Sequence, residues 1–112
     1  MSRNRVMVEV VSGKITRICK RMEPIHGGEL KEWPRAEAVK SIRQQVFERS
    51  QGDCEWCSGP ISWKTMELHE VIYRSKGGEI GTANSVALCY SCHHNDAHGD
   101  RRLRFGEVDA SS

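Results

Sequence analysis

The sequence predicts a small α+β domain that needs more than an apolar core to hold it together. The chain has 112 residues, of which 38% are hydrophobic and 6% aromatic, so a single domain of this length buries a modest core. Apolar residues alternate near the N-terminus and recur at helical spacing further along, which predicts both strands and a helix. Four of the five cysteines form two close pairs. We expect these pairs to supply the stability that the small core lacks.

The first predicted element is a basic β-hairpin. Apolar residues alternate over 5–11, Ser12 and Gly13 supply turn chemistry, and strand-like sequence resumes over 15–18. Residues 1–22 contain six basic residues and one acidic residue, a local charge of +5, whereas the whole chain carries only +2. The hairpin therefore concentrates positive charge that the total hides.

A helix is predicted next, after a loop or linker over 23–32 that contains proline and glycine and shows no period. Pro34 suits the first turn of a helix. The helix is expected to continue to about Arg49 and to end near Gly52. Its apolar positions recur at separations of three, four, seven and eight residues, and they are Ala38, Val39, Ile42, Val46 and Phe47.

The cysteine spacing predicts a structural zinc site. Cys54 and Cys57 form one C-x2-C pair, and Cys89 and Cys92 form a second. Two such turns bring four thiolates to one tetrahedral ion, which leaves no ligand position open for a substrate. The alternative is two disulfides or four inert buried cysteines, which the doubled spacing and the lack of a secretory signal disfavour. Cys19 is interpreted as a small buried hydrophobe.

The segment between and after the cysteine pairs predicts a strand over 66–72, a short strand over 85–88 and a second helix over 93–98 that ends at Gly99. No apolar run is long enough to span a membrane, so we expect a cytoplasmic protein. The predicted division is a basic hairpin and linker over 1–32, a zinc-ribbon domain over 33–105 and a frayed tail over 106–112.

Four of the five histidines, namely His69, His93, His94 and His98, lie within or just after the segment that the zinc would close. Imidazole and carboxylate groups that converge from a strand and a helix would form a second metal site with open positions. Solvated surface histidines are the alternative.

The same residues resemble the zinc-ribbon HNH endonucleases of phages and prophages. The resemblance covers about residues 38–100 and implies a ββα-metal fold, in which a two-stranded ribbon and a helix grip one divalent ion, here braced by the zinc ribbon. The matching positions are Cys54–Cys57, Leu68–Gly78, Asn84 and Leu88–His93.

The resemblance implies a role for each matching residue. His69 takes the place of a ligand to the catalytic metal, and His93 takes the place of a second ligand, with His98 as the expected third contributor. Asn84 takes the place of an asparagine that braces the loop. Glu70 stands where most members have the histidine that acts as general base. Because a carboxylate is ordinarily a weaker base than imidazole, Glu70 either takes the proton from water or binds the metal, and the sequence leaves both roles open.

The resemblance also implies a function. The expected activity is metal-dependent hydrolysis of phosphodiester bonds in double-stranded DNA by a monomer or weak homodimer, with one strand nicked per active site. Mixed nitrogen and oxygen ligands favour Mn²⁺ over Mg²⁺, so we expect either ion to serve and Mn²⁺ to be at least as effective. A bacterial or phage-infected host cell is the expected setting. The rival hypotheses are a non-catalytic zinc ribbon that binds nucleic acid and a purely structural zinc knot.

Basic residues near these elements are candidates for contact with DNA phosphates. Ordinary solvated charge is the alternative for each of them. The candidates are Arg74 and Lys76 beside the predicted active site, and Arg3, Arg5, Lys14 and Arg17 in the hairpin.

Overall fold

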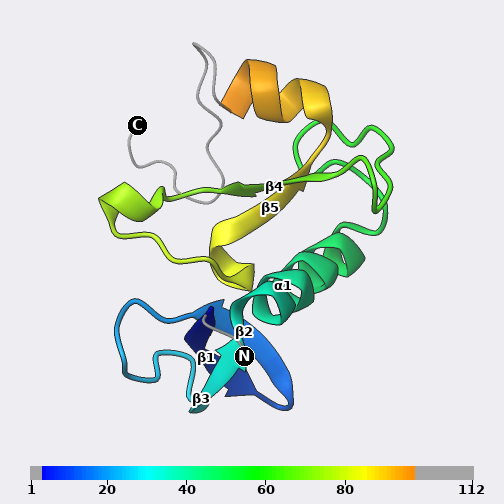
Figure 1. Cartoon of the computed structure of the whole chain (residues 1–112). Coiled ribbons are helices and arrows are strands. Elements are labelled where there is room, and N and C mark those ends of the chain that lie inside the picture. Colours follow the sequence, from blue (N-terminus) through cyan, green and yellow to red (C-terminus); the bar gives the residue numbers. More distant parts are fainter. Residues whose placement is uncertain (1–3, 98–112) are drawn as a thin grey trace.

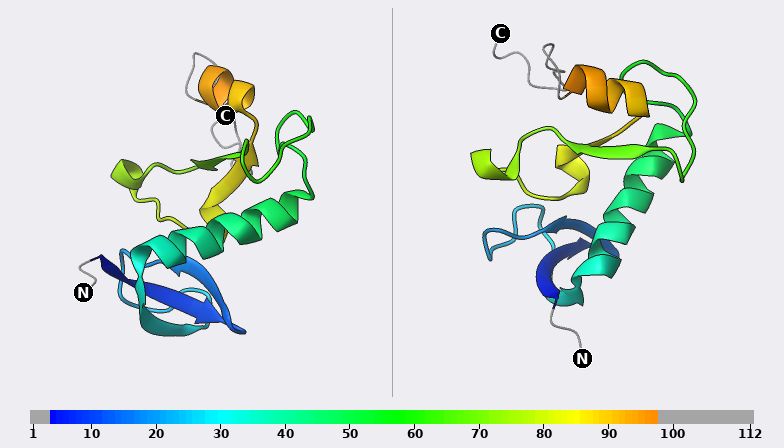
Figure 2. Two further views of the ribbon diagram at one scale, coloured as in Figure 1. Left: turned by 45° about the vertical axis from the view of Figure 1, so that its right-hand side comes forward. Right: turned by 45° about the horizontal axis from the view of Figure 1, so that its top comes forward.

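The computed structural model describes residues 4–97, and residues 1–3 and 98–112 lie outside the described part. Figure 1 shows a long helix running between a three-stranded sheet and a two-stranded hairpin, and Figure 2 shows the same arrangement from two further directions. The elements in chain order are β1 (Arg5–Val11), β2 (Lys14–Ile18), β3 (Glu29–Pro34), α1 (Arg35–Ser50), β4 (Glu67–Glu70), β5 (Ser85–Leu88) and a π-type helix over Cys92–Ala97.

The expected N-terminal hairpin is present and forms part of a larger sheet. β1 lies in the centre of the sheet and pairs antiparallel with both β2 and β3. Ser12 and Gly13 connect β1 to β2 with φ angles of 51° and 81°, the left-handed backbone that a tight hairpin turn requires.

Strand β3 differs from the loop or linker expected over 23–32. Polar residues dominate its sequence, but its backbone pairs with the edge of β1 that would otherwise carry unpaired N–H and C=O groups. Gly28 precedes the strand at a close approach of two chains, where a Cβ atom would lie 2.3 Å from the carbonyl oxygen of Val10. Sheet pairing rather than apolar periodicity therefore determines this element.

Helix α1 follows β3 directly and matches the predicted helix closely. Pro34 is its N-cap in an extended conformation, and Gln51 ends it in the left-handed conformation with a φ of 58°. Ala38, Ile42 and Val46 recur every fourth residue and are fully buried. Within residues 4–97, no helix combines the length and apolar character that crossing a bilayer requires.

Strands β4 and β5 form the second sheet, an antiparallel hairpin with a long connection. Its register pairs Glu67 with Leu88 and Glu70 with Ser85. β5 has the predicted bounds, whereas β4 is shorter than the strand expected over 66–72. Short 3₁₀ turns over Arg74–Lys76 and Thr82–Asn84 occupy the connection.

One hydrophobic core joins both sheets to α1. It confirms the small α+β fold expected from the sequence, with the cysteine cluster at one end. The buried members include Val8, Ile15, Ile18, Ala38, Ile42, Val46, Cys54, Met66, Val86, Ala87, Leu88 and Cys92.

A buried ionic cluster fastens the N-terminal sheet to the rest of the molecule. Arg17 is only 2% exposed, and its Nε donates to Glu9 Oε1 at 2.8 Å. Its Nη1 donates to both carboxylate oxygens of Glu79, at 2.9 and 2.8 Å. Nearby, the Ile18 N–H donates to the Ile80 carbonyl oxygen at 2.7 Å. Arg17 therefore has a structural role, and the expectation that it contacts DNA is corrected because its charge is enclosed and paired.

The loop over 25–28 closes the other side of this cluster. The fully buried Glu9 carboxylate accepts the backbone N–H groups of Ile25 at 3.0 Å, His26 at 2.7 Å and Gly28 at 2.9 Å. The segment expected as a linker thus binds back onto β1, and the N-terminal sheet packs into the same body as α1 and β5.

Candidate functional site

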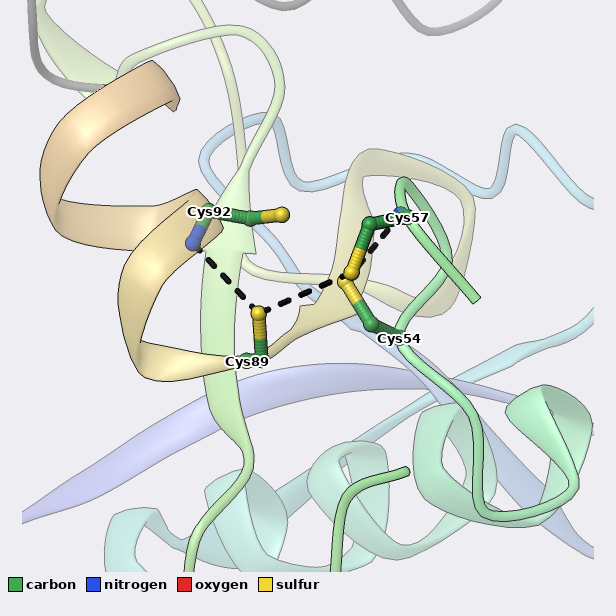
Figure 3. Close-up of side chains that lie close together, drawn as sticks. All are labelled: Cys54, Cys57, Cys89 and Cys92. Carbon is green, nitrogen blue, oxygen red and sulfur yellow. Dashed lines mark hydrogen bonds between the residues drawn. The ribbon is translucent and has the colours of Figure 1, made fainter. Parts of the chain in front are cut away.

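The four paired cysteines converge on one point. Cys54 and Cys57 lie on the turn that follows α1, Cys89 follows β5, and Cys92 begins the π-type helix. Figure 3 shows their side chains directed toward one another. All four Sγ atoms lie within 4.8 Å of one another, and those of Cys57 and Cys89 are 3.8 Å apart. A tetrahedral ion with Zn–S bonds of about 2.3 Å separates its sulfurs by about 3.8 Å.

Backbone N–H groups support these sulfurs. The Trp56 N–H donates to Cys54 Sγ at 3.4 Å, and the Cys92 N–H donates to Cys89 Sγ at 3.4 Å. Burial acts to raise the pKa of Cys54, but backbone N–H donors lower it to about 7. Burial and the neighbouring sulfurs raise the pKa of Cys92. Four clustered thiols ionise together only around a cation, so this donor set fits a structural Zn²⁺.

All five cysteines are free thiols, which sets aside the alternative of two disulfides. Cys19 lies apart from the cluster and is buried, as expected of a small hydrophobe.

A hollow of about 180 Å³ lies beside the cysteine cluster and is lined by three of the residues that the sequence indicates as site residues. His69 and Glu70 reach it from β4, and His93 reaches it from the π-type helix; Leu68 and Tyr73 complete the lining. His69 is 6% exposed, and its ring centroid lies 5.3 Å from that of His93 and 6.1 Å from that of Tyr73. Sequence reasoning missed Tyr73, whose only signal was its place four residues after His69.

Asn84 acts on the loop that follows β4. Its side-chain oxygen accepts the Ile72 N–H at 2.8 Å, and its Nδ2 donates to the carbonyl oxygens of Ile72 and Glu79, both at 2.9 Å. Gly78 packs against this brace, since a Cβ atom there would lie 1.8 Å from the Ile72 carbonyl oxygen. Asn84 thus fixes the path of the chain between the two strands and does not line the hollow.

A second metal-type cluster contains a residue that sequence reasoning also missed. Glu67 Oε1 lies 2.7 Å from His93 Nδ1 and 3.1 Å from His94 Nε2. Donor atoms of these three residues all lie within 4.8 Å of one another. Burial acts to raise the pKa of Glu67, but the two imidazoles leave it below its ordinary value. The available signal was the position of Glu67 two residues before His69, on the same face of β4.

The predicted DNA contacts fall into different environments. Arg5 and Lys14 are exposed on the N-terminal sheet, and Lys76 is exposed in the loop after β4. Arg5 forms an ion pair of 3.5 Å with Glu32. Arg74 begins the 3₁₀ turn that precedes Gly77. Arg3 and His98 lie outside the described residues.

Comparison with known proteins identifies the part of the chain that holds both clusters. Residues 54–99 match the family described as HNH endonuclease. No curated protein and no solved structure shows significant similarity to the chain.

Proposed function

We propose that the protein is a metal-dependent endonuclease that hydrolyses phosphodiester bonds in double-stranded DNA, because residues 54–99 match the HNH endonuclease family. The observation that carries the proposal is the hollow shared by His69, Glu70 and His93 beside the cysteine cluster. A purely binding module needs no such convergence of imidazole and carboxylate groups.

Imidazole and carboxylate groups, the donor types that line the hollow, are ligands that divalent transition-metal ions accept. Imidazoles of His69 and His93 would hold such an ion, with His98 as a further ligand. The helix that carries His93 is of the π type, in which backbone hydrogen bonds link residues five apart, and five positions separate His93 from His98 in the sequence. When bound, a divalent ion stabilises negative charge on the phosphoryl and leaving oxygens.

The protein side chains supply the remaining functions. Glu70, which lines the hollow, accepts the proton of the attacking water as general base. Asn84 holds the 72–79 loop in place, so that Lys76 presents its charge to the DNA backbone. Arg5 and Lys14 extend this contact from the N-terminal sheet. Arg17 is left out, because it is buried.

One active site per chain acts on one strand, so a monomer produces nicks, and cleavage of both strands needs a weak homodimer or two separate events. We propose Mn²⁺ or Mg²⁺ as the working ion, with Mn²⁺ at least as effective, because imidazole ligands suit Mn²⁺ better.

Relaxation of a supercoiled plasmid by the zinc-loaded protein tests the proposal. Added Mn²⁺ should convert supercoiled DNA to open circles before linear molecules appear, and EDTA should stop the conversion. Glu70→Gln should slow nicking by about 100-fold or more, the usual contribution of a general base. Glu29→Gln, which alters a side chain 77% exposed on β3, is the matched control. DNA that is bound but never relaxed with any divalent ion would favour the non-catalytic binding module.

A further inference from the structure

One carboxylate oxygen of Glu67 lies within hydrogen-bond distance of two imidazoles. Glu67 Oε1 lies 2.7 Å from His93 Nδ1 and 3.1 Å from His94 Nε2, although 26 and 27 residues separate the partners in sequence. The two histidines are consecutive in the helix, yet both rings turn toward the same oxygen. Ring stacking of His94 on Tyr90, with centroids 4.1 Å apart, helps to orient the second ring.

We propose that Glu67, His93 and His94 together bind a divalent transition-metal ion, which makes Glu67 and His94 ligands in addition to His93. The assignment rests on the proposed nuclease function in one respect, since His93 also lines the hollow that contains Glu70. An ion held by this cluster therefore borders the proposed active site.

The separations between donor atoms fit coordination. Adjacent ligands on an octahedral ion with bonds of about 2.1–2.2 Å lie about 3.0 Å apart. The distances of 2.7 and 3.1 Å from Glu67 Oε1 to the two ring nitrogens bracket this value. Binding an ion therefore requires only small movements of the three side chains.

The chemistry of the set narrows the kind of ion. Two neutral imidazoles and one carboxylate leave a divalent ion with a net charge near +1 and with open positions for water or a phosphate oxygen. Nitrogen donors favour Mn²⁺, Co²⁺ or Ni²⁺ over Mg²⁺. The nearby cysteine cluster would hold Cys92 in place and, through it, the adjacent His93.

The rival explanation is that Glu67 only orients His93 through a hydrogen bond and that His94 is a surface residue. The two explanations differ at His94, whose side chain is 45% exposed and whose replacement leaves the core intact. An orienting role for Glu67 predicts no effect of His94→Ala on metal binding. A ligand role predicts a clear loss.

Manganese binding measured by electron paramagnetic resonance provides the test, because the signal of free Mn²⁺ falls as the ion binds and needs no cleavage. The full chain is first loaded with one zinc, so that the thiols are occupied. His94→Ala and Glu67→Gln should each weaken Mn²⁺ binding by about tenfold or more. Glu29→Gln should bind as the wild type does.

Wild-type affinity in His94→Ala would overturn the assignment, and this variant decides the question even if Glu67→Gln fails to fold. The plasmid assay separates this outcome from failure of the proposed function. If the wild type cleaves DNA and His94→Ala binds Mn²⁺ with unchanged affinity, the ligand set alone is refuted. If His94→Ala binds Mn²⁺ more weakly and the wild type does not cleave DNA, the ligand set is supported and the nuclease function is refuted.

Discussion

Replacing Arg17 with methionine tests whether the buried ionic cluster holds the N-terminal sheet in place. Methionine keeps most of the length and apolar stem of arginine but removes every donor. The change leaves Glu9 without its cation and Glu79 without its two-pronged partner. It also frees the Glu23 carbonyl oxygen that Arg17 Nη2 contacts.

The expected loss of stability is large for a single substitution. Removing one partner of a buried ion pair typically costs about 3–5 kcal/mol, because the other charge stays enclosed without compensation. The side chains of Arg17 and Glu9 are only 2% and 0% exposed, so solvent does little to reduce this cost. In a domain of this size the cost corresponds to a fall in Tm of about 12–20 °C.

Thermal unfolding followed by circular dichroism measures this effect, with zinc content checked in each preparation. Arg21→Met is the matched control, because Arg21 is 78% exposed and its ion pair with Glu23 is 3.6 Å long; its Tm should change by about 2 °C or less. Adding Glu9→Gln to Arg17→Met should recover part of the loss, since the uncompensated charge disappears. Equal Tm values for Arg17→Met and Arg21→Met would refute the reasoning.

The remaining predictions concern acid, the loop brace and zinc. Burial acts to raise the pKa of Glu9, but backbone N–H groups of the 25–28 loop and Arg17 lower it from 4.5 to about 2. The pKa of Glu9 is lower in the folded protein than in the unfolded chain, so its stabilisation is complete above about pH 4.5 and disappears as the pH falls toward 2. Between about pH 6 and 2, the urea midpoint of unfolding should therefore fall more steeply in the wild type than in Glu9→Gln. Asn84→Ala removes three hydrogen bonds to the loop backbone and should lower Tm by about 4–12 °C, whereas an unchanged Tm would show that the brace is dispensable. Cys57→Ser should reduce bound zinc below one ion per chain by elemental analysis and lower Tm, and full zinc content in this variant would contradict a four-thiolate site.

Much of the fold follows from local sequence. Gly13 suits the left-handed backbone of the hairpin turn, and the apolar spacing of α1 is regular. Strand β3 was missed because its sequence, ELKEWP, is mostly polar and ends in proline. Its strand conformation comes from pairing with β1, which no local pattern displays.

The candidate site divides in the same way. The cysteine cluster was predictable, because two C-x2-C pairs specify a metal site by spacing alone. The sequence places Glu67 on the same face of β4 as His69, but no local pattern shows that the helix brings His93 to within 2.7 Å of Glu67. For Arg17 the sequence predicts an exposed charge that contacts DNA, and this prediction is wrong. Its partner Glu79 lies 62 residues away in the sequence, so no local pattern shows that the fold brings the two within hydrogen-bond distance.

The position of β3 has a consequence for how this chain can recombine. A crossover near residue 32 would separate β1 and β2 from the end of β3, the strand that leads directly into α1. The exchanged N-terminal segment would also replace Arg17, the residue on β2 that forms the ion pair with Glu79. Exchange of this segment between related chains would therefore succeed only when the donor carries a matching arginine and sheet register, so the hairpin and residues 54–99 are expected to be inherited together.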